Sequence, residues 1–153
     1  MQKITPNLWF DGNAKEAIDY YVSVFEDGKI INTTYYPHEG LADFQKDLAG
    51  KVLTIDFELA GQRFTAINAG PEFKFNEAVS FSIACKDQQE INYFWDKLSS
   101  NPQSEQCGWC KDKFGLSWQV VPADMEELMN KPDAFAKLMQ MKKIVIADFD
   151  KAA

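Results

Sequence analysis

Apolar residues follow the same order twice along this chain. In residues 7–25 and again in residues 80–98, a short run of alternating apolar positions leads directly into apolar residues at helical spacing. Alternation with a period of two is typical of a half-buried strand, and spacings of three and four are typical of an amphipathic helix. The pairs brought into register by an offset of 73 residues are Leu8 with Phe81, Phe10 with Ile83, Ile18 with Ile91, Tyr20 with Tyr93, Tyr21 with Phe94, and Phe25 with Leu98. A repeat of this size predicts two similar modules.

The first module is predicted to have the element order βαβββ. Its helix is expected to end at Gly28, and a tight hairpin is expected where Ala60-Gly61-Gln62 separates two strands rich in β-branched and aromatic residues. The elements are strands over residues 4–10, 30–36, 52–59 and 63–68, a helix over residues 14–25, and a long loop with a helical turn over residues 37–50.

The second module is predicted to be degenerate. Residues 101–113 are polar and interrupted by turn residues, so the middle strands of this module are expected to be short. The other expected elements are strands over residues 78–85 and 116–121, helices over residues 91–98, 124–130 and 132–141, and an edge strand over residues 144–149. We therefore expect one α+β domain over residues 1–153, made of modules 1–70 and 78–122 and a C-terminal segment 123–153.

The predicted strands have one apolar face and one polar face. The apolar face is expected to lie under the helices, and two interpretations of the polar face remain open. It is either an ordinary solvent-exposed face or the concave side of a curved sheet that forms a ligand cleft, which the tryptophan among small polar residues favours. The polar set is Asn7, Trp9, Thr54, Asp56, Glu58, Arg63, Thr65, Ser80, Ser82, Ser117 and Gln119.

Charge and composition exclude several classes of function. A net charge of −7 and the lack of a basic stripe oppose binding to nucleic acid. No apolar run reaches the roughly 18 residues that a membrane span needs, and no long apolar leader begins the sequence. Three cysteines, an odd number, argue against a disulfide framework. These features predict a cytoplasmic protein that binds neither nucleic acid nor membranes.

Three segments of the sequence resemble a known family. They are LWFDGNAKEAIDYY at residues 8–21, AINAGPEFKFNE at residues 66–77, and CGW followed by KDKFGLSWQ at residues 107–119. Together with the paired βαβββ modules, they resemble the PhnB-like branch of the glyoxalase/bleomycin-resistance superfamily, also called vicinal oxygen chelate proteins. This branch often bears the label 3-demethylubiquinone-9 3-methyltransferase. The resemblance implies a curved mixed sheet with helices on its convex side, and a homodimer.

The resemblance also implies where a metal would be bound. In metal-dependent relatives each module supplies one ligand from its first strand and one from its last, and these positions correspond here to Asn7, Thr65, Ser80 and Gln119. None of them is His, Asp or Glu, the usual ligands besides Cys for divalent transition ions. No two glycines lie within two residues of each other, so the sequence also lacks a Gly-rich loop for a nucleotide cofactor. We expect neither a metal nor another cofactor.

Two other features of the sequence are candidates for a redox, metal-binding or catalytic role. Cys107 and Cys110 have the C-x-x-C spacing of redox dithiols and zinc sites, but the chain continues into a strand rather than the helix that a thioredoxin-like motif needs. Asp56 is the most plausible general base, although an ordinary ionised carboxylate is the simpler interpretation.

The preferred hypothesis is a small-molecule binding protein with a metal-free cleft. The alternatives are a superfamily enzyme that uses Asp56 or a metal bound elsewhere, and a structural dimer without a ligand. Strand parity places Asn68 on the opposite face from the other candidates, so its inclusion depends on the strand ending there. The candidate ligand-binding residues are Asn7, Trp9, Thr65, Asn68, Ser80 and Gln119.

Overall fold

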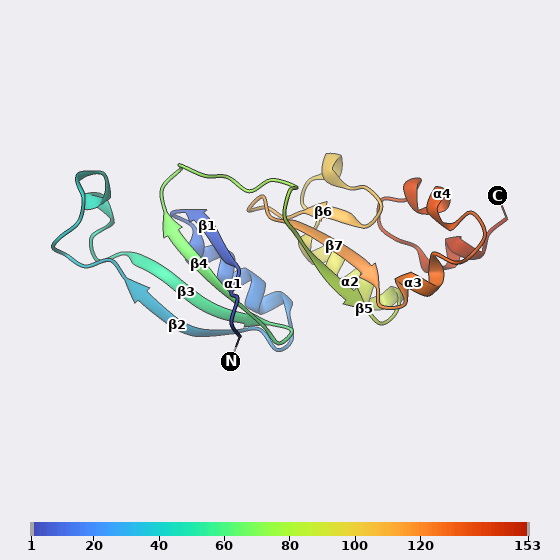
Figure 1. Ribbon diagram of the computed structural model, residues 1–153, viewed down its shortest axis with the longest axis horizontal. Coiled ribbons are helices and arrows are strands. Elements are labelled where there is room, and N and C mark those ends of the chain that lie inside the picture. The colour runs from blue at the N-terminus through green and yellow to red at the C-terminus, as the bar shows by residue number, and fades with distance from the viewer. Residues whose placement is uncertain (1, 153) are drawn as a thin grey trace. The chain divides into compact units, whose positions relative to one another are not determined.

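The first half of the protein forms a compact α+β unit. The computed structural model describes residues 2–152 and divides the chain into two units, Met1–Lys74 and Phe75–Ala153 (Figure 1). The elements of the first unit are β1 (Asn7–Asp11), α1 (Ala14–Val24), β2 (Lys29–Tyr35), the 3₁₀ helix η1 (Asp43–Leu48), β3 (Val52–Leu59) and β4 (Gln62–Ala69).

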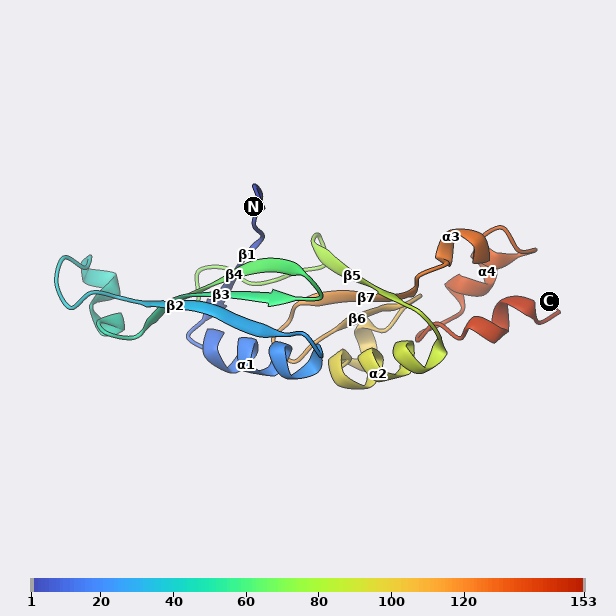
Figure 2. The same ribbon diagram turned by 90° about the horizontal axis from the view of Figure 1, so that it is seen from below.

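The sheet of this unit has the strand order β1-β4-β3-β2, with β1 parallel to β4 and the other pairs antiparallel. Figure 2 shows α1 lying along one face of the sheet. The helix buries Ala17, Ile18 and Tyr21 against that face, because residues at this spacing share one side of a helix. Phe57 and Phe64, which are register partners in the hairpin, stack with ring centroids 5.2 Å apart. The apolar strand face therefore forms the core, as predicted.

The hairpin between β3 and β4 has a two-residue turn. Ala60 and Gly61 have φ angles of 50° and 78°, the left-handed values that fit the twist of a tight hairpin. The strained backbone of Ala60 is held by a hydrogen bond of 2.9 Å from its N–H to Oδ1 of Asp27. The predicted tight turn is confirmed.

The second unit repeats the first with one strand missing. Its sheet has the order β5-β7-β6, in which β5 is parallel to β7 and β6 is antiparallel to it. This is the order of the first sheet without a counterpart of β2, and that place in the sequence holds the short 3₁₀ helix η2. The elements are β5 (Ser80–Cys85), α2 (Gln88–Leu98), η2 (Pro102–Ser104), β6 (Trp109–Lys111), β7 (Ser117–Pro122), α3 (Met125–Leu128), α4 (Ala134–Met139) and the 3₁₀ helix η3 (Ile146–Asp150).

The α+β fold is confirmed, and the middle of the second module is as short as expected, but three C-terminal predictions need correction. The edge strand predicted over residues 144–149 is wrong, because this stretch leads into η3, where Asp148 donates its N–H to the carbonyl of Val145. The helices predicted over residues 124–130 and 132–141 are shorter than expected. Asp124 makes no side-chain cap, and Asp133 precedes α4 in a left-handed conformation that helix residues do not adopt.

The C-terminal segment has its own apolar cluster and is fixed to the rest of the second unit by hydrogen bonds. Gln88 at the start of α2 donates to the carbonyl of Ile144 at 2.9 Å and accepts from the N–H of Ile146 at 2.8 Å. The N–H groups of Cys107 and Gly108 donate to Met141 and Lys142. The buried members of the cluster are Leu128, Ala134, Met141, Ile144 and Phe149.

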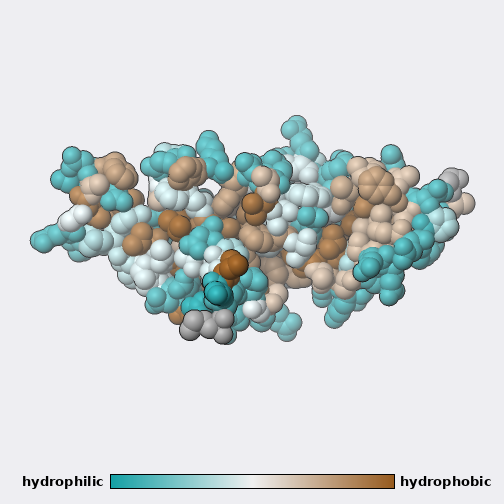
Figure 3. Space-filling model, in the orientation of Figure 1, coloured by the Kyte–Doolittle hydropathy of each residue, from teal (hydrophilic) through white to brown (hydrophobic). Residues whose placement is uncertain are grey.

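Some hydrophobic surface remains exposed in each unit. Figure 3 shows hydrophobic areas over η1 and over α4, each surrounded by hydrophilic side chains. Phe44 of η1 is 79% exposed, and Phe135 and Met139 of α4 are also exposed. Among the described residues, no helix combines the length and the hydrophobicity needed to cross a membrane.

Candidate functional site

The first unit contains a cavity of about 400 Å³ close to where β2 and β4 end and β3 begins. Its floor comes from the strands, because the lining residues Trp9 of β1 and Ile67 of β4 are register partners in the sheet. Leu53 and Ala69 line the cavity at the ends of their strands, and one wall comes from Phe44 and Leu48 of η1. The helical turn predicted in the long loop therefore supplies a wall of the site.

Trp9 is held firmly in this cavity. Its indole N–H donates to the carbonyl of Gly70 at 2.9 Å. Phe73 packs edge-on against it, with ring centroids 4.8 Å apart and an interplanar angle of 80°. An indole fixed at both its polar and its apolar edge presents a rigid surface to a ligand, so little rotamer entropy is lost on binding.

Tyr36 lines the cavity from the residue after β2. It is buried, and its hydroxyl donates to the carbonyl of Asn68 at 2.6 Å. Burial raises the pKa of Tyr36, and the negative charge of Glu72 raises it further. The phenol therefore stays neutral at physiological pH and acts as a hydrogen-bonding group of the wall, not as a base.

Asn68 has a structural position on the core side of β4. It is 6% exposed, and its Oδ1 accepts from the N–H of Ala14 at 3.1 Å while its Nδ2 donates to the carbonyl of Val52 at 3.0 Å. The amide thus caps the start of α1, where Asn13 makes no side-chain cap. Both ends of the amide are used in this way, and Asn68 does not line the cavity. We therefore assign Asn68 a structural role and not a ligand-binding one.

Three other predicted residues lie on the same sheet face as Trp9 but outside the cavity lining. Asn7 and Thr65 are register partners in β1 and β4. Thr65 donates its hydroxyl to Oδ1 of Asp56 at 2.7 Å, and the guanidinium of Arg63 lies 3.7 Å from Oδ2 of the same carboxylate. These contacts hold Asp56 as a paired carboxylate on the open face.

The predicted residues of the second unit also meet each other. Gln119 of β7 donates from Nε2 to the hydroxyl of Ser80 on β5 at 2.9 Å. Ser117 belongs to the polar strand face predicted from the sequence, but it is only 1% exposed and its Oγ has no hydrogen-bond partner. Strand parity alone does not predict how deeply a side chain such as Ser117 is buried.

Comparison with known proteins identifies the family. Residues 2–121 match the family described as 3-demethylubiquinone-9 3-methyltransferase. The chain belongs to this family. A solved structure described as a putative 3-demethylubiquinone-9 3-methyltransferase, PhnB protein, from Bacillus cereus is 34% identical, with 80% of this chain and 100% of that chain covered and a TM-score of 0.64. The predicted membership in the PhnB-like branch is confirmed.

Two more distant solved structures also match the chain, and the first of them shares the fold. Protein PA1353 from Pseudomonas aeruginosa is 19% identical over 80% of this chain and 98% of its own, with a TM-score of 0.58. The fosfomycin resistance protein FosX from Listeria monocytogenes is 12% identical over 83% of this chain and 98% of its own, with a TM-score of 0.47. No curated protein matches the chain. The C-terminal segment after residue 121 lies outside the family match.

The residues at the family's metal positions do not fit a divalent transition ion. Asn7, Thr65, Ser80 and Gln119 supply only neutral amides and hydroxyls, which bind such ions weakly compared with imidazole, thiolate or carboxylate. Gln119 and Ser80 are bonded to each other, and Thr65 is bonded to Asp56. Within residues 2–152, no three His, Cys, Asp or Glu side chains come close enough to hold an ion together.

Asp112 was not predicted as an important residue, although it lies in one of the family segments. This buried carboxylate closes the turn between β6 and β7. Its Oδ1 accepts from the N–H groups of Phe114 at 2.8 Å and Leu116 at 3.1 Å, and its Oδ2 accepts from the indole N–H of Trp118 at 2.8 Å. The available signal was an Asp three residues before a glycine, the pattern of an Asx turn leading into a strand. The segment is therefore explained by folding, not by catalysis.

The C-x-x-C pair forms part of a turn and not a reactive dithiol. Cys107 lies in the tight turn before β6, while the side chain of Cys110 is buried on β6. Burial raises the pKa of Cys110 from 9.0 to about 12, with smaller contributions from Asp112 and Glu105, and burial also raises the pKa of Cys107. A thiol must ionise to attack a disulfide or to bind zinc, so both shifts oppose those roles.

We expect the three thiols to react at very different rates in the folded protein. At pH 8, a shift of the pKa from 9.0 to about 12 lowers the thiolate fraction of Cys110, and likewise of Cys85, by about a thousandfold. A disulfide-forming thiol reagent should therefore modify Cys107 first, and all three cysteines only after unfolding. The Cys107→Ser variant serves as the control and should show no fast thiol. Fast modification of Cys110 in the folded protein would contradict this assignment.

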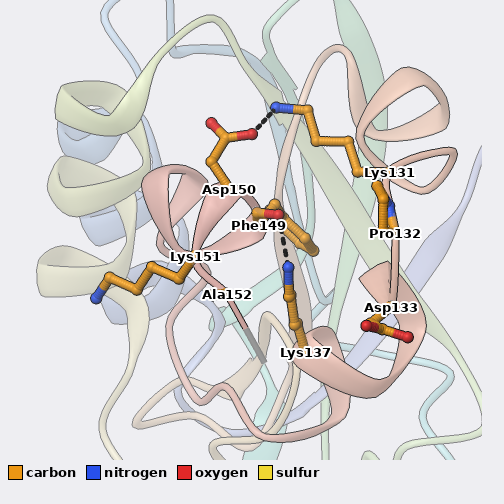
Figure 4. A pocket seen from close by; sticks show the side chains of 8 residues that line it. All are labelled: Lys131, Pro132, Asp133, Lys137, Phe149, Asp150, Lys151 and Ala152. Carbon is orange, nitrogen blue, oxygen red and sulfur yellow. Dashed lines mark hydrogen bonds and ion pairs between the residues drawn. The ribbon is translucent and has the colours of Figure 1, made fainter.

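A second cavity, of about 320 Å³, lies in the C-terminal segment (Figure 4). Three lysines line it, but each ammonium group already has a partner. Lys131 pairs with Asp150 at 2.5 Å, and Lys137 donates to the carbonyl of Phe149 at 2.9 Å. Lys151 pairs with Asp148. The first two bonds tie η3 to α4 and to the segment just before it, so we assign this cavity a structural role.

Proposed function

We propose that this protein binds a small organic molecule in the cavity beside Trp9, and that binding needs no metal ion. The observation that carries the proposal is the cavity itself, whose volume of about 400 Å³ falls in the range of small-ligand sites. Its floor of Trp9, Leu53 and Ile67 is apolar, and only a few polar groups border it, which is the usual composition of such sites.

The aromatic residues of the cavity favour a ligand with a flat or apolar body. Trp9 presents a fixed ring, and Phe44 stands 79% exposed at the rim on η1. A ligand in the cavity could pack against this exposed ring and remove its apolar surface from water. The polar residues Asn7 and Thr65 continue the same sheet face and would meet a ligand that extends beyond the cavity.

A catalytic role is the second candidate, and Asp56 is the residue that favours it. Its carboxylate lies on the open face with Thr65 donating to it, so a substrate on this face would meet an oriented proton acceptor. The methyl transfer in the family's name would also need a methyl-donating cofactor. The strand-to-helix connections β1–α1 and β5–α2 contain one glycine and none, respectively, so neither forms a Gly-rich cofactor loop.

The proposal is tested by a thermal-shift screen of aromatic and amphipathic compounds on protein stripped of metal by a chelator. A compound that binds the folded state raises the apparent stability, so hits should appear without added ions. The variant Phe44→Ala should weaken these shifts, while Phe135→Ala, at another exposed phenylalanine in the second unit, should leave them unchanged. No hits, or hits only after divalent ions are restored, would overturn the proposal.

Homodimerisation and a cytoplasmic location follow from the resemblance and the composition, and both remain predictions. β2 is an edge strand with exposed apolar residues at Ile30, Ile31 and Tyr35, which makes it a candidate contact for a second copy. Sedimentation analysis of the purified protein measures the oligomeric state directly.

A further inference from the structure

We propose that the ligand of the Trp9 cavity is an organic cation, an amine that carries an apolar body. The inference rests on the binding function proposed above and adds the charge of the ligand. It is carried by one feature of the cavity: two carboxylates and three aromatic rings line it, and no Lys, Arg or His is among its lining residues.

Glu72 places its negative charge beside Gly70, a lining residue of the cavity next to Trp9. A β-carbon built on Gly70 would lie 2.8 Å from Oε2 of Glu72, so the carboxylate is folded over the backbone of Gly70. The carbonyl of this same Gly70 accepts the indole N–H of Trp9. Tyr36 also lines the cavity, and the charge of Glu72 adds to burial in raising its pKa.

Asp47 adds a second carboxylate from η1, on the wall that also contains Phe44 and Leu48. The neighbouring Lys46 does not neutralise it, because its ammonium group pairs with Asp43 at 3.2 Å and is not part of the lining. The cavity therefore has an apolar floor and an acidic rim. A cation at the rim would meet both carboxylates while its apolar part covers the floor.

The aromatic rings of the cavity are the second feature that favours a cationic ligand. Trp9, Tyr36 and Phe44 line the cavity, and the face of an aromatic ring attracts ammonium groups through the negative potential above the ring. A phosphate or carboxylate ligand needs cationic or N–H donors, and the lining residues supply no cationic side chain. The same cavity therefore opposes anionic ligands and favours protonated amines over neutral molecules of equal shape.

The test compares three probes of matched size: phenethylamine, 2-phenylethanol and 3-phenylpropionate. Binding is followed at the Trp9 indole N–H resonance in ¹⁵N-labelled protein at pH 7, where an alkylamine is protonated. We expect phenethylamine to bind about tenfold more tightly than the alcohol, more weakly as salt is added, and the carboxylate to bind least.

The double variant Asp47→Asn with Glu72→Gln should reduce the affinity for phenethylamine to that for the alcohol and leave alcohol binding unchanged. Glu126→Gln, an exposed carboxylate of the second unit, is the matched control and should change neither affinity. Equal binding of amine and alcohol at Trp9, or no effect of the double variant, would overturn the choice of a cation while the binding function stands. If no probe and no screened compound moves the Trp9 resonance, both proposals are wrong.

Discussion

Replacing Asp112 with alanine should lower the free energy of unfolding by about 3 to 5 kcal/mol, the range for breaking a buried charged network. The change leaves three donors without their acceptor: the backbone N–H groups of Phe114 and Leu116 and the indole N–H of Trp118. Asp112 is only 4% exposed, so water cannot easily replace the lost bonds. For a chain of this length, the loss corresponds to a fall in Tm of roughly 6 to 20 °C.

Two further variants make this prediction specific. Asp112→Asn keeps one oxygen for the backbone N–H groups but loses the acceptor for Trp118, so its stability should fall between those of alanine and the native residue. Asp124→Ala removes an exposed aspartate that makes no side-chain cap and should change the free energy of unfolding by less than about 0.5 kcal/mol. Urea unfolding measures all three. If Asp112→Ala behaves like Asp124→Ala, the assigned role of Asp112 is wrong.

Replacing Trp9 with alanine should weaken ligand binding by about ten- to a hundredfold, because a buried aromatic contact of this size contributes about 1.5 to 3 kcal/mol. The change removes the floor of the cavity and also the N–H that holds Gly70. Trp9→Phe keeps a ring but loses that N–H, so it should lose less affinity than alanine. The dissociation constant of a compound found in the screen provides the measurement.

The control for Trp9 must separate binding from folding. Trp95 of α2 lies in the other unit, and Trp95→Phe should leave the dissociation constant unchanged. Thermal unfolding of Trp9→Ala without ligand shows whether the first unit stays folded. Unchanged affinity in a folded Trp9→Ala protein would place the ligand elsewhere.

The sequence predicted the parts of the fold that depend on local periodicity. The β1–α1 and β5–α2 units were predictable because apolar residues such as Ile18 and Ile91 recur at helical spacing. The tight hairpin was predictable because Gly61 tolerates a left-handed conformation. η3 was missed because a short run of β-branched residues suits a strand, whereas packing of Phe149 into the C-terminal cluster favours a turn of helix.

The site was predictable only in part. Strand parity placed Trp9 on the open face, but parity does not show where along that face a cavity lies. The cavity depends on Phe44 and Leu48, which the pattern placed in a long loop with a helical turn but not beside the sheet. The roles of Asn68 and Asp112 depend on partners far along the chain or across a turn, such as the bond from Ala14 to Asn68 across 54 residues. Such contacts leave little trace in the local sequence pattern.

Metal-free binding beside Trp9 is best tested by calorimetric titration of the metal-stripped protein with the strongest compound from the screen. We expect one site per chain, with the same dissociation constant in chelator and in added zinc or manganese, and with weaker binding in Trp9→Ala. This expectation is contradicted if binding requires an ion that the protein retains through dialysis and loses when Thr65 or Gln119 is replaced.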